Sequence, residues 1–526
     1  MQRKWWTLGA VSVATFMLLL DITVVNTALP AIQEDLGASF TELQWVIDAY
    51  TLALAALVLT AGSLADRLGR RRVFAIGLGI FSVSSLAAGL APDPTFLNIA
   101  RAVQGIGGAV MFAVSLALVA QEFAPGRERG TAMGIYGATI GVSVAIGPLV
   151  GGALVDSLGW EWVFFINVPV GIAAIAVTYA KLRESRDPNA TGVDWGGLVT
   201  FSSSLFLLVL GLLRGNEEGW GSPLILSLLG GATALLVAFL VIETRVKQPM
   251  LPLRLFRKPA FTGVQLAALG VSASMFALFL YITFYLQNHL GHSPLEAGLI
   301  YLPFTVVTFF VAAAGGALLA RFPARVIMSV GLGLTGVGLL LMSGVQAGDE
   351  WTTLLAGFLV AGAGVGLLNP VIADVAVSVV PKEQSGMAAG INDTFRQVGV
   401  AVGIAAWGAI FLSRGASEVE QLAAGTPAAT GERPRQLIEA VSSGNLDAAT
   451  ASIPAGSRET VTDAAGQGFI TGLNEIVMLG GVVSLVAAVA ALWLVRERDI
   501  ERDAPIELPE PRITPDGQAA LEPVPA

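Results

Sequence analysis

The segment FMLLLDITVVNTALP, residues 16–30, places one carboxylate, that of Asp21, inside a run of apolar side chains. The run continues on both sides and predicts a helix over residues 5–29, which is long enough to cross a membrane and too long for the core of a signal peptide. A charged side chain in such a helix costs about 2.5–3.5 kcal/mol on insertion scales and usually has a partner and a function. The segment therefore predicts a membrane protein that uses Asp21.

The composition extends this prediction to the whole chain of 526 residues, of which 54% are hydrophobic and 13% are charged. Soluble domains carry about 25% charged residues. The apolar runs are continuous and do not alternate, which favours membrane helices over a barrel. Fourteen membrane-spanning helices are predicted, over residues 5–29, 43–64, 73–91, 95–121, 131–155, 162–180, 196–213, 222–242, 260–286, 296–320, 326–345, 351–379, 385–412 and 469–495.

The distribution of Lys and Arg predicts the orientation, because segments rich in these residues stay in the cytoplasm. With the N-terminus inside, most of the 30 Lys and Arg residues fall in the predicted inner segments. The sequence therefore predicts a multi-pass protein of the cytoplasmic (inner) membrane with both termini in the cytoplasm. Residues 413–468 form a predicted extracytoplasmic loop. The sequence is compatible both with short amphipathic helices in this loop and with a flexible linker. Residues 499–526, rich in proline and acids, are predicted to be a disordered cytoplasmic tail.

Two pairs of loop segments repeat within the chain. PGRERGTAMGI (125–135) resembles PKEQSGMAAGI (381–391), and GSLADRLGRR (62–71) resembles GALLARFPAR (316–325). The chain is therefore predicted to be all-α, with an N-terminal six-helix bundle (1–185), two inserted helices with a basic linker (186–259) and a C-terminal six-helix bundle (260–412 and 469–498). Two such halves with a site between them are typical of transporters.

Five segments resemble motifs of the major facilitator superfamily, and specifically of its fourteen-helix drug:proton antiporters. These are LDITVVNTALP (20–30), GSLADRLGRRR (62–72), RAVQGIGGA (101–109), GATIGVSVAIGPLVGG (137–152) and INDTFRQVGVAVGIA (391–405). The resemblance covers nearly the whole chain and implies the major facilitator fold. It also implies a proton-coupled antiporter that exports small amphipathic compounds, such as drugs or antibiotics, by alternating access.

A candidate site for proton coupling follows from depth along the helices, at about 1.5 Å per residue. Asp21, Asp48 and Arg101 lie roughly 12, 8 and 9 Å from the predicted outer ends of their helices. We expect them to share one polar cluster. Burial disfavours an ionised carboxylate and a nearby arginine favours it, so movement of Arg101 could load and release a proton. Asp21 is the first candidate for the proton carrier, Asp48 is the alternative, and a static ion pair that orients the helices is the simpler interpretation.

The resemblance also implies a cytoplasmic gate and a glycine motif. The gate residues are Gly62, Asp66, Arg67, Gly69 and Arg70. Asp66 is expected to dock near Ser385, where the start of a helix favours an anion. The antiporter glycine motif comprises Gly137, Gly141, Gly147, Pro148, Gly151 and Gly152. Its small residues would let another helix pack closely, although ordinary packing explains them equally well.

Further polar residues in predicted helices are possible contacts for a substrate. They are Asn26, Gln104, Asp374, Asn392, Asp393 and Arg396. Asn392 and Arg396 are four residues apart and would share a helix face. Arg396 could contact a substrate or pair with Asp374 or Asp393.

The remaining features narrow the class of function. The chain has no cysteine, which excludes disulfides and thiolate metal sites, and His289 and His292 are interpreted as loop residues. No Walker-type ATP site and no clustered catalytic set occur, so neither an enzyme nor a cofactor is predicted. The expected partners are a small-molecule substrate, protons and membrane lipid, with no nucleic acid, and the chain is expected to be a monomer driven by the proton gradient. A same-fold carrier for a metabolite or lipid remains an alternative, and a polytopic membrane enzyme is a weaker one.

Overall fold

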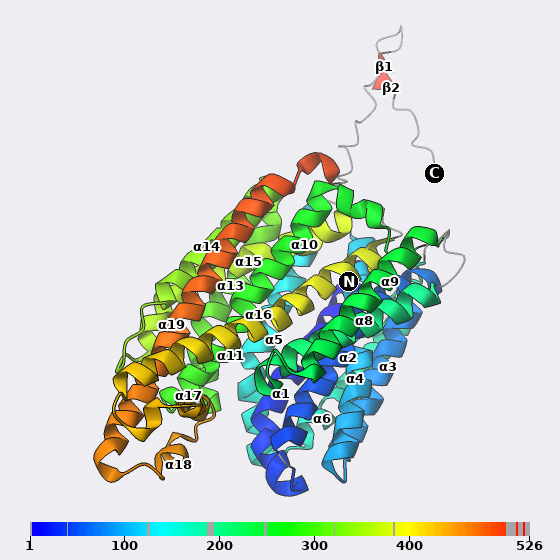
Figure 1. The fold of residues 1–526 in the computed structure, drawn as a ribbon. Helices are drawn as coiled ribbons and strands as arrows, with labels where there is room; N and C mark the ends of the chain where they lie inside the picture. The colour runs from blue at the N-terminus through cyan, green and yellow to red at the C-terminus, as the bar shows by residue number, and fades with distance from the viewer. Residues whose placement is uncertain are drawn as a thin grey trace.

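The computed structural model is a bundle of long helices (Figure 1). It describes residues 3–38, 40–123, 127–186, 194–246, 249, 251–319, 321–381, 384–500, 512–513 and 519–520. Of the tail predicted to be disordered, the structure describes only Asp499, Ile500 and two antiparallel two-residue strands, β1 (Arg512–Ile513) and β2 (Ala519–Ala520).

The chain divides into an N-terminal half, an inserted pair of helices and a C-terminal half. The N-terminal half consists of α1 (Arg3–Leu36), α2 (Phe40–Leu68), α3 (Arg70–Gly89), α4 (Pro94–Glu122), α5 (Arg127–Leu158), α6 (Trp162–Phe165) and α7 (Asn167–Lys181). The inserted pair is α8 (Trp195–Glu218) and α9 (Pro223–Arg245), followed by η1 (Leu253–Arg257). The C-terminal half consists of α10 (Pro259–Val271), η2 (Ser272–Phe276), α11 (Ala277–Phe284), η3 (Tyr285–His289), α12 (Pro294–Ile300), α13 (Leu302–Leu319), α14 (Ala324–Met342), η4 (Trp351–Leu354), α15 (Leu355–Ser378), α16 (Ser385–Leu422), η6 (Pro427–Ala429), α17 (Arg433–Ser442), α18 (Leu446–Thr450), α19 (Ala455–Leu494) and η7 (Glu497–Asp499).

Within the described residues, twelve helices are long and apolar enough to cross a membrane. The helices α5 and α13 add two shorter described apolar stretches, Leu149–Leu158 and Leu302–Gly315. Together these account for the fourteen predicted helices, and the all-α prediction is confirmed. We call the end of the bundle where α2 gives way to α3 the basic end, because Arg70–Arg72 lie there. The opposite end, where α17 and α18 lie, is the loop end (Figure 1).

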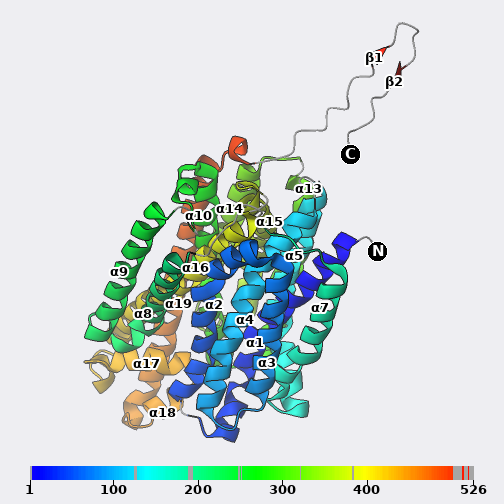
Figure 2. The same ribbon diagram turned by 90° about the vertical axis from the view of Figure 1, so that its right-hand side faces the viewer.

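The inserted pair lies along one side of the bundle (Figure 2). Helix α8 packs against both α2 and α16, so it contacts both halves. Its contacts with α2 include a hydrogen bond of 3.0 Å between the hydroxyls of Thr60 and Ser202. Helix α9 lies further out, since only 17% of the residues in its most apolar segment are buried within the protein. An apolar helix so little buried in protein is suited to contact with lipid.

At the loop end, α16 and α19 extend beyond the spans predicted from hydropathy. Between them lies α17, whose Leu437, Ile438 and Val441 are buried in one apolar cluster with Val419 and Phe469. This apolar contact outside the predicted spans explains why the two long helices continue. Of the two alternatives for residues 413–468, the amphipathic helices are the ones that form.

The first span of the C-terminal half contains two π-helical turns, η2 and η3. A π-turn interrupts the regular ladder of backbone hydrogen bonds, and such turns often lie at functional sites. In η2 the carbonyl of Ala273 accepts a hydrogen bond of 2.7 Å from the indole of Trp407 on α16. About two turns further on, the hydroxyl of Tyr281 donates to the carbonyl of Ile404 at 2.8 Å. These side chains attach the irregular helix to α16.

Candidate functional site

The carboxylate of Asp21 on α1 is completely buried and accepts hydrogen bonds from three donors. Arg101 Nη1 of α4 lies 2.6 Å from Oδ2, and the side chain of Asp21 is 0% exposed. Gln104 Nε2 donates to Oδ1 at 2.9 Å, and Asn167 Nδ2 donates to the same oxygen at 2.9 Å. Hydrogen bonds to an ionised group are shorter and stronger than those between neutral groups. The cage of donors therefore matches the ionised form of Asp21.

Arg101 is held from several sides, which fixes its guanidinium beside Asp21. Its Nε donates to the carbonyl of Val46 on α2 at 2.9 Å, and Nη1 also donates to Gln104 Oε1 at 2.7 Å. The guanidinium carbon lies 4.3 Å from the ring centroid of Tyr50, within the range of a cation–π contact. The arginine therefore links α1, α2 and α4.

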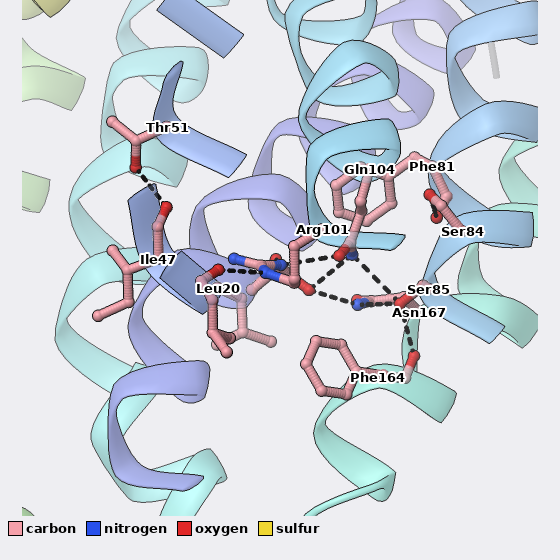
Figure 3. Close-up of polar contacts among 12 residues, drawn as sticks. Leu20, Ile47, Thr51, Phe81, Ser84, Ser85, Arg101, Gln104, Phe164 and Asn167 are labelled. Atoms are coloured by element: carbon pink, nitrogen blue, oxygen red, sulfur yellow. Dashed lines mark hydrogen bonds and ion pairs between the residues drawn. The ribbon is translucent and has the colours of Figure 1, made fainter. Parts of the chain in front are cut away.

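Two members of the cluster were not predicted from the sequence, namely Asn167 at the start of α7 and Ser85 on α3 (Figure 3). The hydroxyl of Ser85 accepts from Asn167 at 3.0 Å and from Gln104 at 3.2 Å, and donates to the carbonyl of Phe164 at 2.9 Å. Both residues are buried. The available signal was the same one that identified Asp21, because Asn167 stands alone between apolar residues in FINVP.

Asp48 does not belong to the cluster that was expected to contain it together with Asp21 and Arg101. Its ion pair is with Arg214 of α8 at 3.9 Å, and its side chain is 20% exposed. The ion pair of Arg101 is with Asp21. Depth along a helix gives the height of a side chain but not the face from which it projects, and Asp48 projects toward the inserted pair. The two carboxylates are therefore attached to different cations.

At the basic end, Asp66 joins the two halves. Its Oδ1 accepts from the amide of Gly386 at 3.1 Å and its Oδ2 from the amide of Met387 at 2.8 Å, at the start of α16. Arg70 lies on the same carboxylate, with Nη2 at 2.8 Å from Oδ1. A helix N-terminus presents free N–H groups and a positive partial charge to an anion. A second bond between the halves runs from Arg129 Nη1 of α5 to the hydroxyl of Ser378 on α15, at 3.1 Å.

The other predicted gate residues surround this contact. A Cβ at Gly62 would overlap the backbone carbonyl of Gly386, so α2 and α16 touch there. Gly69 has a φ of 109°, which favours glycine, and joins α2 to α3. Arg67 is half-buried in the last turn of α2.

The glycine motif of α5 faces two neighbours. Near the basic end a Cβ at Gly137 would lie 3.3 Å from Asn369 on α15, and one at Gly141 would lie 3.4 Å from Thr308 on α13. Toward the loop end, Gly147 and Gly151 lie directly against α1, where an added Cβ would overlap the hydroxyls of two threonines. At these four glycines, α5 thus lies close to a neighbouring helix, as the motif predicted. The same does not hold for Gly152, which has no neighbour within 4 Å of an added Cβ, because it points away from both contacts. Pro148 lies in α5, with its side chain outside the described residues.

The polar residues of the C-terminal half form separate contacts. Asn392 donates to Gln265 of α10 at 3.0 Å, whereas Arg396 donates to Asn369 of α15 at 2.9 Å. Arg396 thus hydrogen-bonds an amide and has Asp393 as an electrostatic neighbour. Both aspartates are buried, Asp374 on α15 and Asp393 on α16. Of the remaining predicted contacts, Gln104 belongs to the Asp21 cage, and the side chain of Asn26 on α1 lies outside the described residues.

The described part of the chain contains no group of three or more His, Cys, Asp or Glu side chains that could hold a metal ion. The site is instead an arrangement of carboxylates, guanidinium groups and amides across several helices. The donors to Asp21 come from α4 and α7, so a movement of these helices relative to α1 would change the hydrogen bonding of its carboxylate.

Comparison with known proteins agrees with the fold and the motifs. The sequence model of the Major Facilitator Superfamily matches residues 11–404. The chain is 36% identical over 515 residues to the tetracenomycin C resistance and export protein of Streptomyces glaucescens, covering 97% of this chain and 95% of that protein. It is 37% identical over 414 residues to the puromycin resistance protein pur8 of Streptomyces alboniger, covering 77% and 81%. Among solved structures, the human organic anion transporter MFSD10 shares the fold, with a TM-score of 0.60 at 14% identity over 92% of this chain and 100% of that one.

Proposed function

Because this chain belongs to the major facilitator superfamily, we propose that it is a proton-coupled antiporter that exports small amphipathic organic compounds by alternating access. It is a monomer of the cytoplasmic membrane. Both termini and the basic end of the bundle face the cytoplasm. The positive-inside rule supports this orientation, since Arg70–Arg72 and the basic linker lie at that end. The names of the relatives, which refer to antibiotic resistance and to export, support drugs and antibiotics as the class of substrate.

The observation that carries the proposal is the donor cage around Asp21. All three groups contact its carboxylate through N–H donors, and Gln104 Oε1 already accepts from Arg101. A proton on Asp21 would add an O–H that points at these donors without an acceptor. A buried donor without an acceptor costs about 1–3 kcal/mol. Protonation of Asp21 and opening of the cage are therefore coupled.

This coupling gives a transport cycle. With the halves joined at the basic end by Asp66, the present conformation faces the outside. Protonation of Asp21 from that side releases Arg101 and loosens α1 from α4. The halves then rock, the contact of Asp66 with α16 breaks, and the proton leaves to the cytoplasm. Return of the ionised carboxylate to its cage accompanies outward movement of the substrate.

Transport in everted membrane vesicles with an imposed pH gradient tests this proposal, with a panel of dyes and antibiotics. We expect uphill export by the wild type, loss of uphill export with retained binding in Asp21→Asn, and loss of coupling in Arg101→Ala. Asp48→Asn serves as the matched control, since Asp48 pairs with Arg214 and not with Arg101. If Asp48→Asn is inactive while Asp21→Asn exports normally, Asp48 is the proton carrier. Export that is independent of the gradient would refute the proposal.

A further inference from the structure

A second buried carboxylate, that of Asp393, lies in the other half and has surroundings opposite to those of Asp21. It lies on α16, eight residues from the start of that helix, which places it roughly 12 Å from the basic end. The residue is 6% exposed. Whereas Asp21 accepts from three donors, Asp393 has no hydrogen bond and no ion pair within 4.0 Å among the described residues. The chain therefore saturates one carboxylate and leaves the other without a donor.

The nearest cation to Asp393 is directed elsewhere. Arg396, one helical turn along α16, donates to the amide oxygen of Asn369 on α15 at 2.9 Å. It remains an electrostatic neighbour of Asp393 without forming a direct bond to it. The charge of Asp393 is thus only partly balanced by groups of this chain.

Asp393 lies where the two halves meet. Tyr136 of α5 has Asp393 and Arg396 as its charged neighbours, and Thr15 of α1 as a hydrogen-bonding neighbour. The next residue on α5, Gly137, approaches Asn369 of α15. Among the described residues, the titratable groups shown to interact with Asp393 are Arg396 on its own helix and the phenol of Tyr136 across the boundary between the halves. This boundary is the region that opens and closes in alternating access.

An ionised carboxylate without hydrogen-bond donors is costly in such surroundings, and a buried charge is tolerated when a counter-charge accompanies it. A bound organic cation supplies that counter-charge at the boundary between the halves. We propose that Asp393 is the carboxylate that binds the positively charged group of exported organic cations, giving up its proton to water as the cation arrives. The step balances, because the O–H bond of the carboxylic acid breaks, the proton enters the solvent, and the cation replaces it beside the carboxylate. The inference rests on the proposed export function and deepens it by naming a substrate class.

Proton release on binding tests the inference in the purified protein. The probe is tetraphenylphosphonium, a permanent cation that carries no acidic proton, so that any proton released comes from the protein. In weakly buffered detergent solution near neutral pH, we expect the wild type to release about one proton for each cation bound, as exchange at a single carboxylate requires. Asp393→Asn should bind the probe at least about tenfold more weakly and release no proton. Chloramphenicol, which is neutral, should bind both proteins alike and release none.

Two further variants keep the test decisive. Asp393→Glu retains a carboxylate and should restore proton release. Glu475→Gln, which replaces a carboxylate by an amide in the middle of α19, should behave as the wild type. Equal affinity and equal proton release in Asp393→Asn and wild type would overturn the inference. So would a folded Asp393→Glu that binds the probe without releasing a proton. Failure of the proposed function is distinguishable, because then the wild type exports neither probe from vesicles under a pH gradient.

Discussion

The ion pair of Asp21 and Arg101 offers the most direct quantitative prediction, because both partners are fully buried. In Asp21→Asn one carboxylate oxygen becomes an NH₂ group. At the position of Oδ2 it would face Arg101 Nη1, now 2.6 Å away, and at the position of Oδ1 it would face two amide nitrogens, now 2.9 Å away. At least one donor therefore loses its acceptor, and Arg101 loses its counter-ion.

Removing one partner of a buried ion pair costs about 3–5 kcal/mol, because the other charge remains buried. We expect this loss in the free energy of unfolding for Asp21→Asn and a similar loss for Arg101→Met. The double variant, which contains neither charge, should lose less than the sum of the two, by a coupling of about 0.5–3 kcal/mol. It should nevertheless remain unable to couple export to protons, since it contains no carboxylate at residue 21.

The assay is unfolding of the purified variants in mixed micelles, followed by circular dichroism, alongside transport in everted vesicles. Asp447→Asn on the exposed surface of α18 is the control and should change the free energy by no more than about 0.5 kcal/mol. Strictly additive losses in the double variant, or a fully stable Asp21→Asn, would refute the argument that Arg101 neutralises Asp21. Uphill export by the double variant would refute the role in coupling.

Three further outcomes are expected. Asn167→Ala removes one of the three donors to the Asp21 carboxylate. We expect a loss of about 1–3 kcal/mol in the free energy of unfolding and a changed pH profile of export. An unchanged pH profile would mean that Asn167 has a structural role only. Gly386→Ala places a Cβ against the carboxylate of Asp66 and should weaken the contact that joins the halves at the basic end. The leak of protons into liposomes in the absence of substrate should then rise several-fold over wild type. An unaltered leak would contradict a gating role for this contact. The chain has no native cysteine, so the double variant Thr60→Cys with Ser202→Cys should form one disulfide between α2 and α8 on oxidation. We expect export to continue in the oxidised protein. Loss of export that dithiothreitol reverses would mean that α8 must separate from α2 during transport.

Much of the fold could be predicted from the sequence, because a membrane imposes a simple requirement on it. Every span must be a long apolar helix, and each of the fourteen predicted segments is helical in the structure. Helix ends at the loop end could not be predicted in the same way. There, α16 and α19 continue because α17 packs between them, which is a tertiary effect that hydropathy does not report.

The candidate site was predictable in part for the same reason. A charge in an apolar run is conspicuous, and similar depth was enough to associate Asp21 with Arg101. Depth does not give the face of a helix, so Asp48 was grouped with them although it pairs with Arg214. Asn167 stands alone between apolar residues and could have been singled out in the same way, whereas Ser85 is one of three serines in residues 82–85 and only its hydrogen bonds in the folded protein distinguish it.

The contact of Asp66 with α16 has a consequence for which substitutions the first turn of α16 tolerates. On the side of α16 the contact consists of backbone amides, which every residue except proline provides. A substitution of Met387 by any residue except proline would therefore keep its amide donor to Asp66. Gly386 is the exception, because any side chain there would collide with the carboxylate. Of the two residues whose amides hold Asp66, only the first must therefore be glycine, since the second contributes its backbone alone to this contact.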